Sequence, residues 1–428
     1  MAVAARTAGE RERTEVIVVG AGPSGLTAAT RLAQLGVPHV LIDAGEALTQ
    51  TSNAALVHAS TIEIMDVLGI GQMIIGAGHK IHRMVMSDRS GSLARIDLSG
   101  VPSPFPFALG IPQSSTEALL LGHLSSLGGS VRRGHSVDSV ESSSGGYVVS
   151  GRVDSDTGER RFELQAPYVL GCDGSHSTVR SELNVGFPGE TYPEQFVLAD
   201  VQLESPPSNA GEAAIRVSPY GVTVIGRIAQ DRYRVVATVD ADATVPDTPD
   251  KAYVEALFRE RDISARLVAE PEWSSRFRVH HRLADNFRSG GVFLVGDAAH
   301  VHSPAAGQGL NTGIADAYDI TTRLAAVLTE QADESILDGY EQARRAAAQE
   351  VVRFTHRMTS MATLQHPIAR FVRRVALGVL TRVPAVHGRI TMWVTGLERS
   401  PLRDESLPDM PPRTGPGLII VGSEVHPS

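Results

Sequence analysis

The feature that most constrains the fold is a glycine-rich segment near the N-terminus, set between an apolar run and a helical pattern. Residues 16–19 are four consecutive β-branched residues, typical of a strand buried in a parallel sheet. The segment 20–25 reads G-x-G-x-x-G, and residues 24–36 carry apolar side chains at helical spacing. A second apolar run, 40–42, ends at Asp43. This order predicts a βαβ unit of the Rossmann type.

Each glycine of this segment has a physical reason to be there. Gly20 permits the tight turn, Gly22 lets the backbone approach a pyrophosphate, and Gly25 allows close packing of helix on strand. The helix that opens at Pro23 and Ser24 directs N–H groups and a partial positive charge at the phosphates. Asp43 follows at the distance where a carboxylate binds ribose hydroxyls. The segment predicts a dinucleotide site but does not separate NAD from FAD.

Composition excludes several classes of function. The net charge is −9 and no long basic run interrupts the sequence, which argues against nucleic acid as a partner. The single cysteine, Cys172, permits no intrachain disulfide, and we expect it to be a buried core residue. His300 and His302 lack the further ligands that a metal site needs, so no metal is expected. Residues 1–13 lack the apolar core of a signal peptide, and no apolar run is long enough to span a bilayer, so we expect a cytoplasmic protein.

Two further motifs decide between the cofactors. Residues 168–180 contain Asp173-Gly174 and end at Arg180, and residues 296–311 begin with Gly296-Asp297. In order and spacing these motifs resemble those of the class A flavoprotein monooxygenases, the p-hydroxybenzoate hydroxylase-like family. Gln113 and the segments 187–190 and 198–200 match the family as well. The resemblance covers residues 14–400.

The resemblance implies which residues bind the cofactor and what the chain does. Pro304 and Gly307 match positions next to the flavin and the substrate. The residues implied in binding FAD are Gly20, Gly22, Pro23, Ser24, Gly25, Asp43, Gln113, Asp173, Arg180, Gly296, Asp297, Gly309, Leu310 and Asn311. The implied reaction is hydroxylation of a phenolic or polycyclic aromatic substrate by O2 through a flavin C4a-hydroperoxide, with NADPH or NADH reducing the FAD.

The family also implies an α/β architecture. We expect a Rossmann-like FAD-binding domain with an inserted antiparallel β-sheet substrate domain and a C-terminal helical region. The FAD-binding domain would comprise residues 14–80, 105–180 and 285–330, and the substrate domain residues 81–104 and 181–284. Helices would follow over 331–400, and an irregular surface tail over 401–428.

Departures from the family pattern keep alternatives open. Many relatives carry arginine where this chain has Asn53 and Ser60, so this chain need not share their FAD affinity or their NAD(P)H coupling. One alternative is a protein that binds FAD without consuming NAD(P)H. Epoxidation and Baeyer–Villiger insertion are alternatives within the same chemistry. The pair His280-His281 is expected to lie at a surface or strand edge rather than in the substrate pocket. The sequence does not give the substrate, the choice of NADPH or NADH, or the oligomeric state.

Overall fold

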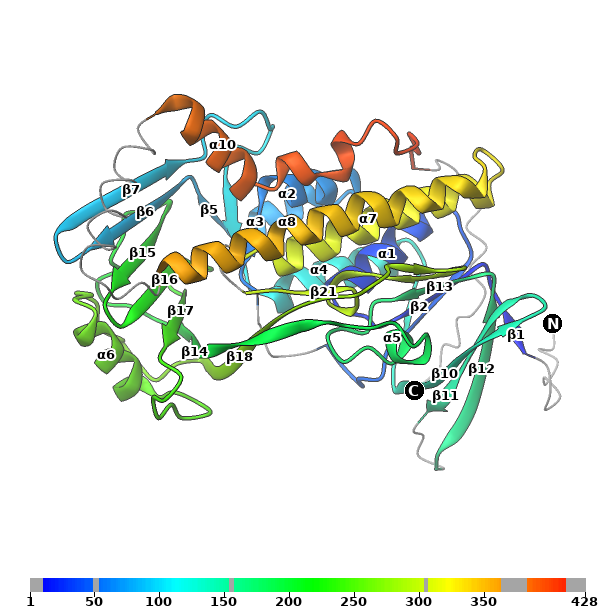
Figure 1. Cartoon of the computed structure of the whole chain (residues 1–428), viewed down its shortest axis with the longest axis horizontal. Helices are drawn as coiled ribbons and strands as arrows, with labels where there is room; N and C mark the ends of the chain where they lie inside the picture. Colours follow the sequence, from blue (N-terminus) through cyan, green and yellow to red (C-terminus); the bar gives the residue numbers. More distant parts are fainter. Residues whose placement is uncertain (1–10, 49–53, 154–157, 304–306, 363–382, 413–428) are drawn as a thin grey trace.

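A computed structural model of the chain describes residues 11–48, 54–153, 158–303, 307–362 and 383–412, and Figure 1 shows their arrangement. Two sheets organise these residues. One lies at the centre of the nucleotide-binding part, and the other forms a broad wall beside it, with the long helix α8 (Asp338–Ala362) running from the first toward the second. Among the described residues, no helix is long and apolar enough to cross a membrane.

The first sheet has six strands in the order β19-β20-β13-β2-β3-β9. Five of them are parallel, and only the edge strand β19 runs antiparallel to its neighbour. All four residues of β2 are buried, as its unbroken β-branched sequence predicted. The strands are β2 (Val16–Val19), β3 (His39–Ile42), β9 (Val131–Arg132), β13 (Tyr168–Gly171), β19 (Arg288–Ser289) and β20 (Val292–Leu294).

Helix α1 (Pro23–Gln34) follows β2 directly and packs between α4 (Gln113–Ser126) and α7 (Gly309–Leu328). Ten consecutive residues of α1, from Gly25 to Gln34, are buried. A helix that is buried on most of its circumference lies inside the molecule rather than on its surface. The βαβ unit and the α/β fold class expected from the sequence are therefore confirmed.

The second sheet has eight strands in the order β21-β18-β14-β17-β16-β15-β6-β7. Every pair is antiparallel except β15 with β6. It is the inserted antiparallel sheet that the family resemblance implied. The strands are β6 (Arg83–Asp88), β7 (Gly91–Asp97), β14 (Gly189–Val201), β15 (Glu212–Ser218), β16 (Gly221–Arg227), β17 (Tyr233–Val239), β18 (Trp273–Leu283) and β21 (His300–Val301).

One face of the eight-stranded sheet is covered by a helix that the sequence analysis did not predict. Helix α6 (Lys251–Glu260) packs Val254 and Phe258 against Val235 and its neighbours. The side chain of Asp250 caps its first turn by accepting a hydrogen bond from the Tyr253 amide. The opposite face meets the C-terminal helices, where Ala213 and Ile215 pack with residues of α8 and of α10 (Pro384–Val394).

Smaller elements complete the fold. A four-stranded sheet, β1-β12-β11-β10, and a three-stranded sheet, β4-β8-β5, flank the nucleotide-binding part. Their strands are β1 (Glu12–Arg13), β10 (His135–Ser143), β11 (Gly146–Val153), β12 (Arg160–Ala166), β4 (Leu56–Val57), β5 (His79–Ile81) and β8 (Ala108–Gly110). The remaining helices are α2 (Ala59–Val67), α3 (Gly71–Ala77) and α5 (Thr178–Glu182), and single 3-10 turns occur at Gly296–Ala298, Glu334–Leu337, Leu397–Arg399 and Pro401–Arg403.

The end of the described chain is bound to the core and does not run free over the surface, which corrects the expectation for residues after Pro401. We call Leu397–Met410 the C-terminal segment. Its Met410 is buried, and the Met410 carbonyl accepts a 2.5 Å hydrogen bond from the fully buried Arg31 of α1. Arg403 forms a bidentate ion pair with Glu63 of α2. Residues 413–428 lie outside the described residues.

Candidate functional site

Four neighbouring strands of the six-stranded sheet end side by side, and each is followed by a residue that the sequence singled out. In the sheet order β20, β13, β2, β3, these are Asp297, Asp173, the turn Gly20–Gly25 and Asp43. The four strands are mutually parallel, so all four positions lie at the carboxyl edge of the sheet. This edge is where open α/β sheets bind extended nucleotides.

The glycine turn has the geometry that a phosphate site requires. Gly20 has φ +100°, and a side chain there would meet the Cys172 backbone. A side chain at Gly25 would strike the Gly20 carbonyl, so only glycine lets α1 pack this closely on the turn. Above Gly22 there is open space, with no atom within 4 Å of an added Cβ. Helix α1 starts with no side-chain cap, which leaves its first N–H groups for an anionic ligand.

Asp43 lies beside this turn and helps to shape it. One carboxylate oxygen accepts a 2.6 Å hydrogen bond from the Ala21 amide, and the other accepts from the Gly45 amide at 2.8 Å. Arg133, just after β9, reaches the same carboxylate at 3.1 Å. Sequence reasoning missed Arg133, because nothing near it in the chain marks it as a neighbour of Asp43.

The turn after β20 exposes a single carboxylate. Asp297 is exposed, while its neighbours from Val292 to His300 are buried. Gly296 has φ +62°, and a Cβ there would lie 2.5 Å from the Ser24 hydroxyl. Ser24 also lies against Gly313 of α7, a close approach that the sequence analysis did not identify. The starts of α1 and α7 are thereby held against the turn that presents Asp297.

Asp173 and Arg180 are held by the structure in different ways. Asp173 accepts hydrogen bonds from the Ser177 hydroxyl at 2.6 Å and the Val179 amide at 3.1 Å. Burial raises the pKa of Asp173, and these two hydrogen bonds oppose the rise. Arg180 donates to the Ala298 carbonyl at 2.8 Å and lies over the Phe187 ring. Its guanidinium therefore ties the Asp173 loop to the Asp297 turn, rather than pointing away from the protein.

Gln113 and Asn311 both hold the segment around β4. Gln113 accepts a 3.2 Å hydrogen bond from the Ala54 amide through its side chain. The Asn311 side chain accepts from the His58 amide at 2.8 Å and donates to the carbonyls of Leu56 and Gly307, at 2.9 and 2.7 Å. The two residues thus fix the chain on either side of β4, and Asn311 ties this strand to the start of α7.

The remaining expected positions lie near the start of α7. Gly309 is the first residue of this helix, and Leu310 is partly buried. Gly307 has φ +61° and faces Leu56, so its backbone conformation favours glycine. Pro304 and Asn53 lie outside the described residues.

Ser60 occupies a position where an arginine would not fit. It is 7% exposed, and its hydroxyl lies against Gly396, where an added Cβ would come within 2.6 Å of it. Its amide donates a 3.2 Å hydrogen bond to the Thr395 carbonyl. The departure from the family pattern at Ser60 is therefore explained by close packing against the turn that follows α10.

Two histidines of the Asp297 motif are buried and stacked at 6.2 Å. His300 donates through Nε2 to Asp316 at 2.6 Å, and His302 donates through Nδ1 to the Ser303 carbonyl at 3.1 Å. Burial and the neighbouring His300 lower the pKa of His302 to about 4. No group of three or more His, Cys, Asp or Glu side chains in the described part of the chain is arranged to hold a metal ion.

His280 lies on β18, near Arg282 and near His176 of the Asp173 loop. Its Nδ1 is 2.8 Å from the Thr191 hydroxyl on the neighbouring strand. Its pKa is lowered by partial burial and by the nearby Arg282 and His176. The pair His280-His281 therefore lies on a strand of the eight-stranded sheet, with His280 bound to the neighbouring strand.

The arrangement at the sheet edge fits FAD. Open space above Gly22 and an uncapped helix N-terminus suit a pyrophosphate, and the exposed Asp297 two strands away suits the hydroxyls of a ribityl chain. The N-terminus of α7 lies beside this aspartate, where its partial positive charge would face the flavin ring.

Comparison with known proteins agrees with this geometry. The family model described as "FAD binding domain" matches residues 13–355. A 12-dehydrotetracycline 5-monooxygenase/anhydrotetracycline 6-monooxygenase of Streptomyces rimosus is 34% identical over 97% of this chain and 84% of its own length. The solved structure of an anhydrotetracycline hydroxylase from Streptomyces rimosus superposes with a TM-score of 0.73 at 30% identity, over 90% of this chain and 76% of the other.

One relative has a name of a different kind. A dialkyldecalin synthase of Streptomyces rugosporus is 29% identical over 95% of this chain and 84% of its own length. Its name denotes no oxygenation. Since the family match and the relatives named as monooxygenases agree with the site, the chain belongs to the FAD-binding family of flavoprotein monooxygenases, in which NAD(P)H is the usual reductant.

Proposed function

We propose that this chain uses FAD and NAD(P)H to insert one oxygen atom of O2 into a phenolic, polycyclic aromatic substrate. The observation that carries the proposal is the order of Asp297, Asp173, the glycine turn and Asp43 along one sheet edge. The substrate class is supported by the relatives that are named for tetracycline precursors.

The protein's own groups bind and orient the cofactor. The N–H groups at the start of α1 bind the pyrophosphate, and Asp297 accepts hydrogen bonds from the ribityl hydroxyls. The N-terminus of α7 stabilises negative charge on the flavin ring. FAD, when bound, supplies the chemistry that activates O2, which no amino-acid side chain provides.

The substrate side is formed by the face of the eight-stranded sheet that α6 does not cover. Phe196 and Phe277 pack together on this face with centroids 5.6 Å apart. On the same face, Asp200 and Arg234 form a buried ion pair, with Arg234 over the Trp273 ring. Phe196, Asp200 and Arg234 are buried, so they support this face of the sheet rather than line an open cavity.

The proposal is tested with the purified holoprotein, by measuring NADPH and NADH oxidation with and without anhydrotetracycline and simpler polyphenols. We expect at least one such compound to accelerate oxidation and to be recovered as a hydroxylated product. Asp297→Ala should weaken FAD binding at least about tenfold, because a hydrogen bond to a charged group contributes about 1.5–3 kcal/mol. The control Asp242→Ala changes an exposed aspartate after β17 and should leave FAD binding unchanged.

A second candidate function is favoured by one comparison. The dialkyldecalin synthase is 29% identical to this chain, and its name does not describe an oxygenation. On this candidate, the chain binds FAD and converts its substrate without consuming NAD(P)H. Substrate conversion under anaerobic conditions without NAD(P)H would support this candidate. Conversion that requires both O2 and NAD(P)H would exclude it.

A further inference from the structure

One buried carboxylate on α7 binds three groups from different parts of the chain. Asp316 is 0% exposed. Its Oδ2 accepts hydrogen bonds from the Gly296 amide at 3.2 Å and from His300 Nε2 at 2.6 Å. Its Oδ1 accepts from Arg344 Nε, on α8, at 2.7 Å. Both oxygens are therefore used, and each serves a different element.

The bond to Gly296 matters most, because it reaches the turn that presents Asp297. Gly296 has φ +62°, and its amide points into the protein, toward Asp316. This hydrogen bond fixes the orientation of the turn. It thereby also fixes the position from which the exposed Asp297 carboxylate extends. His300 follows the 3-10 turn Gly296–Ala298 and binds the same carboxylate. Asp316 therefore accepts hydrogen bonds from both ends of this turn.

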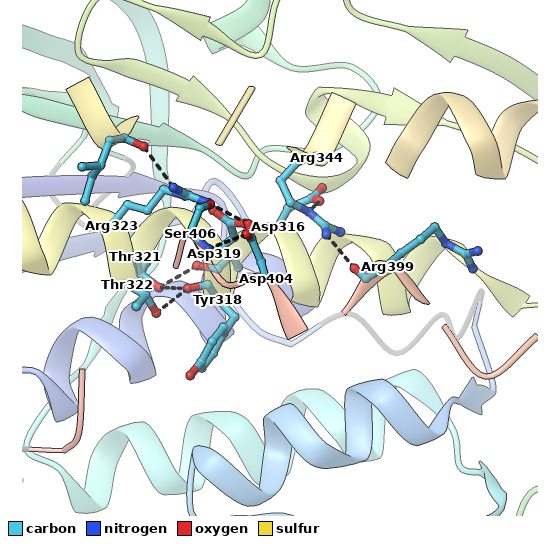
Figure 2. Close-up of polar contacts among 12 residues, drawn as sticks. Asp316, Tyr318, Asp319, Thr321, Thr322, Arg323, Arg344, Arg399, Asp404 and Ser406 are labelled. Atoms are coloured by element: carbon cyan, nitrogen blue, oxygen red, sulfur yellow. Dashed lines mark hydrogen bonds and ion pairs between the residues drawn. The ribbon is translucent and has the colours of Figure 1, made fainter. Parts of the chain in front are cut away.

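A second path joins Asp316 to the start of α7. Arg344 also donates to the Arg399 carbonyl at 2.9 Å, and Figure 2 shows Arg344 between Asp316 and Arg399. Arg399 in turn reaches the side chain of Gln308 at 3.4 Å, and Gln308 is the N-cap residue of α7. The network thus links the Asp297 turn with the helix end expected to face the flavin ring, by way of α8 and the C-terminal segment.

The charge on Asp316 is stabilised by its partners. Burial alone would raise its pKa, but Arg344 and His300 outweigh this effect and hold the pKa below the ordinary value of an aspartate. An ionised Asp316 carboxylate can accept hydrogen bonds from all three donors, because both of its oxygens are acceptors. In a protonated carboxyl group, one of these oxygens would carry a hydrogen and act as a donor.

A nearby aspartate gives a matched contrast. Asp319 lies on the same helix and is 1% exposed, and it pairs with Arg323 at 2.6 Å. Its Oδ2 has no hydrogen-bond partner, and no contact from Asp319 to the Asp297 turn is recorded among the described residues. Asp316 and Asp319 therefore share helix, burial and an arginine partner. They differ in the link to the cofactor turn and in acidity, because burial raises the pKa of Asp319 to about 6.

We propose that Asp316 is a positioning residue for FAD: by fixing the Gly296 amide and His300, it sets the orientation in which Asp297 meets the ribityl chain. This inference rests on the proposed role of Asp297. It adds that the affinity for FAD depends on a fully buried residue that does not touch the cofactor.

The test compares Asp316→Asn with Asp319→Asn. Asparagine has one acceptor oxygen, so Asp316→Asn must turn its NH2 group toward either Arg344 or the Gly296–His300 pair. In Asp319→Asn the oxygen can keep the bond to Arg323 while the NH2 group replaces the unpartnered Oδ2. We expect the dissociation constant of FAD to rise about tenfold or more in Asp316→Asn and to stay within about twofold in Asp319→Asn, as for other residues that orient a ligand-binding group. The visible circular dichroism of bound FAD should change only in Asp316→Asn. Equal dissociation constants and spectra in the two variants would overturn the proposal.

A second pair of variants keeps the test decisive if Asp316→Asn does not fold. His300→Gln retains a side-chain donor for Asp316, and His300→Phe removes it while keeping a ring against Phe287. We expect FAD affinity to be largely retained in His300→Gln and reduced in His300→Phe, and equal losses would count against the proposal. If the wild-type protein bound no FAD, the proposed function itself would fail. If the wild type binds FAD but the two variants of each pair bind FAD equally well, only the proposed role of Asp316 fails.

Discussion

Asp297, Asp173 and Asp43 follow neighbouring strands, but their surroundings give them different tasks. Asp297 is exposed, so both of its oxygens can bind a ligand. Asp173 and Asp43 already accept backbone and hydroxyl hydrogen bonds that shape their own loops. A carboxylate that shapes a loop and one that meets a ligand are similar in sequence, and only the structure distinguishes them.

His302 predicts how stability depends on pH. Burial lowers its pKa to about 4 in the folded protein, against 6.5 for an ordinary histidine. Between these values the unfolded chain binds a proton that the folded chain does not, so stability falls as pH falls from 6.5 to 4. With about 1.4 kcal/mol per pKa unit, the loss from this residue is at most about 3.5 kcal/mol.

The measurement is urea unfolding of wild type and His302→Gln at several pH values between 4 and 8. We expect the stability of the variant relative to wild type to improve as pH falls through this range. A constant difference between the two proteins would show that His302 does not take part.

At the scale of elements, α7 is the part of the fold on which the site depends most. Its first turn lies by the expected flavin ring, Gly313 lies against Ser24 and Gly296, and Asp316 binds the Asp297 turn. One helix thereby fixes both the glycine turn and the second motif.

Two helical glycines test this packing. A Cβ at Gly313 would strike the Ser24 hydroxyl and lie 3.2 Å from the Gly296 Cα, whereas a Cβ at Gly388 of α10 has no atom within 4 Å. Alanine is favoured over glycine in a helix by about 0.8–1 kcal/mol. Gly388→Ala should therefore raise the thermal midpoint, and Gly313→Ala should lower it and weaken FAD binding. If both variants were stabilised, the close approach of α7 to Ser24 would be wrong.

Much of this element-scale organisation could be predicted from the sequence. The strand at 16–19 and the helix after the glycine turn each have a strong local pattern, and the structure shows them within two residues of the expected bounds. Helix α6 was missed among strands, although Asp250 before an apolar i, i+3, i+4 pattern was a usable signal. Asp316 and Arg133 were missed for another reason: their partners are distant in sequence, and no local pattern specifies such contacts.

At the scale of the whole molecule, the C-terminal segment fastens distant elements together. It binds α1 through Arg31, α2 through Arg403, α7 through Asp404 and α8 through the Arg399 carbonyl. Figure 2 shows Asp404 and Ser406 meeting Arg323 of α7. The residues after Pro401 are rich in proline, which suggested an irregular surface tail. Amino-acid composition cannot predict ion pairs with residues that are distant in the sequence.

Two arginines that hold this segment should contribute very different amounts to stability. Arg323 is 1% exposed, and Arg323→Met would leave the buried Asp319 without its partner, at a cost of about 3–5 kcal/mol. Arg403 is partly exposed, so Arg403→Met should cost about 1 kcal/mol or less. Urea unfolding measures both, and similar losses would contradict the distinction between buried and exposed pairs.

The central claim is that this chain is an FAD-dependent monooxygenase of an aromatic compound. The most direct measurement supplies the holoprotein with NADPH or NADH, ¹⁸O2 and an accepted polyphenol, and determines the product mass. The account predicts a product that contains one atom of ¹⁸O, formed only when the reductant is present. A product without ¹⁸O, or one formed equally well without reductant and O2, would contradict it.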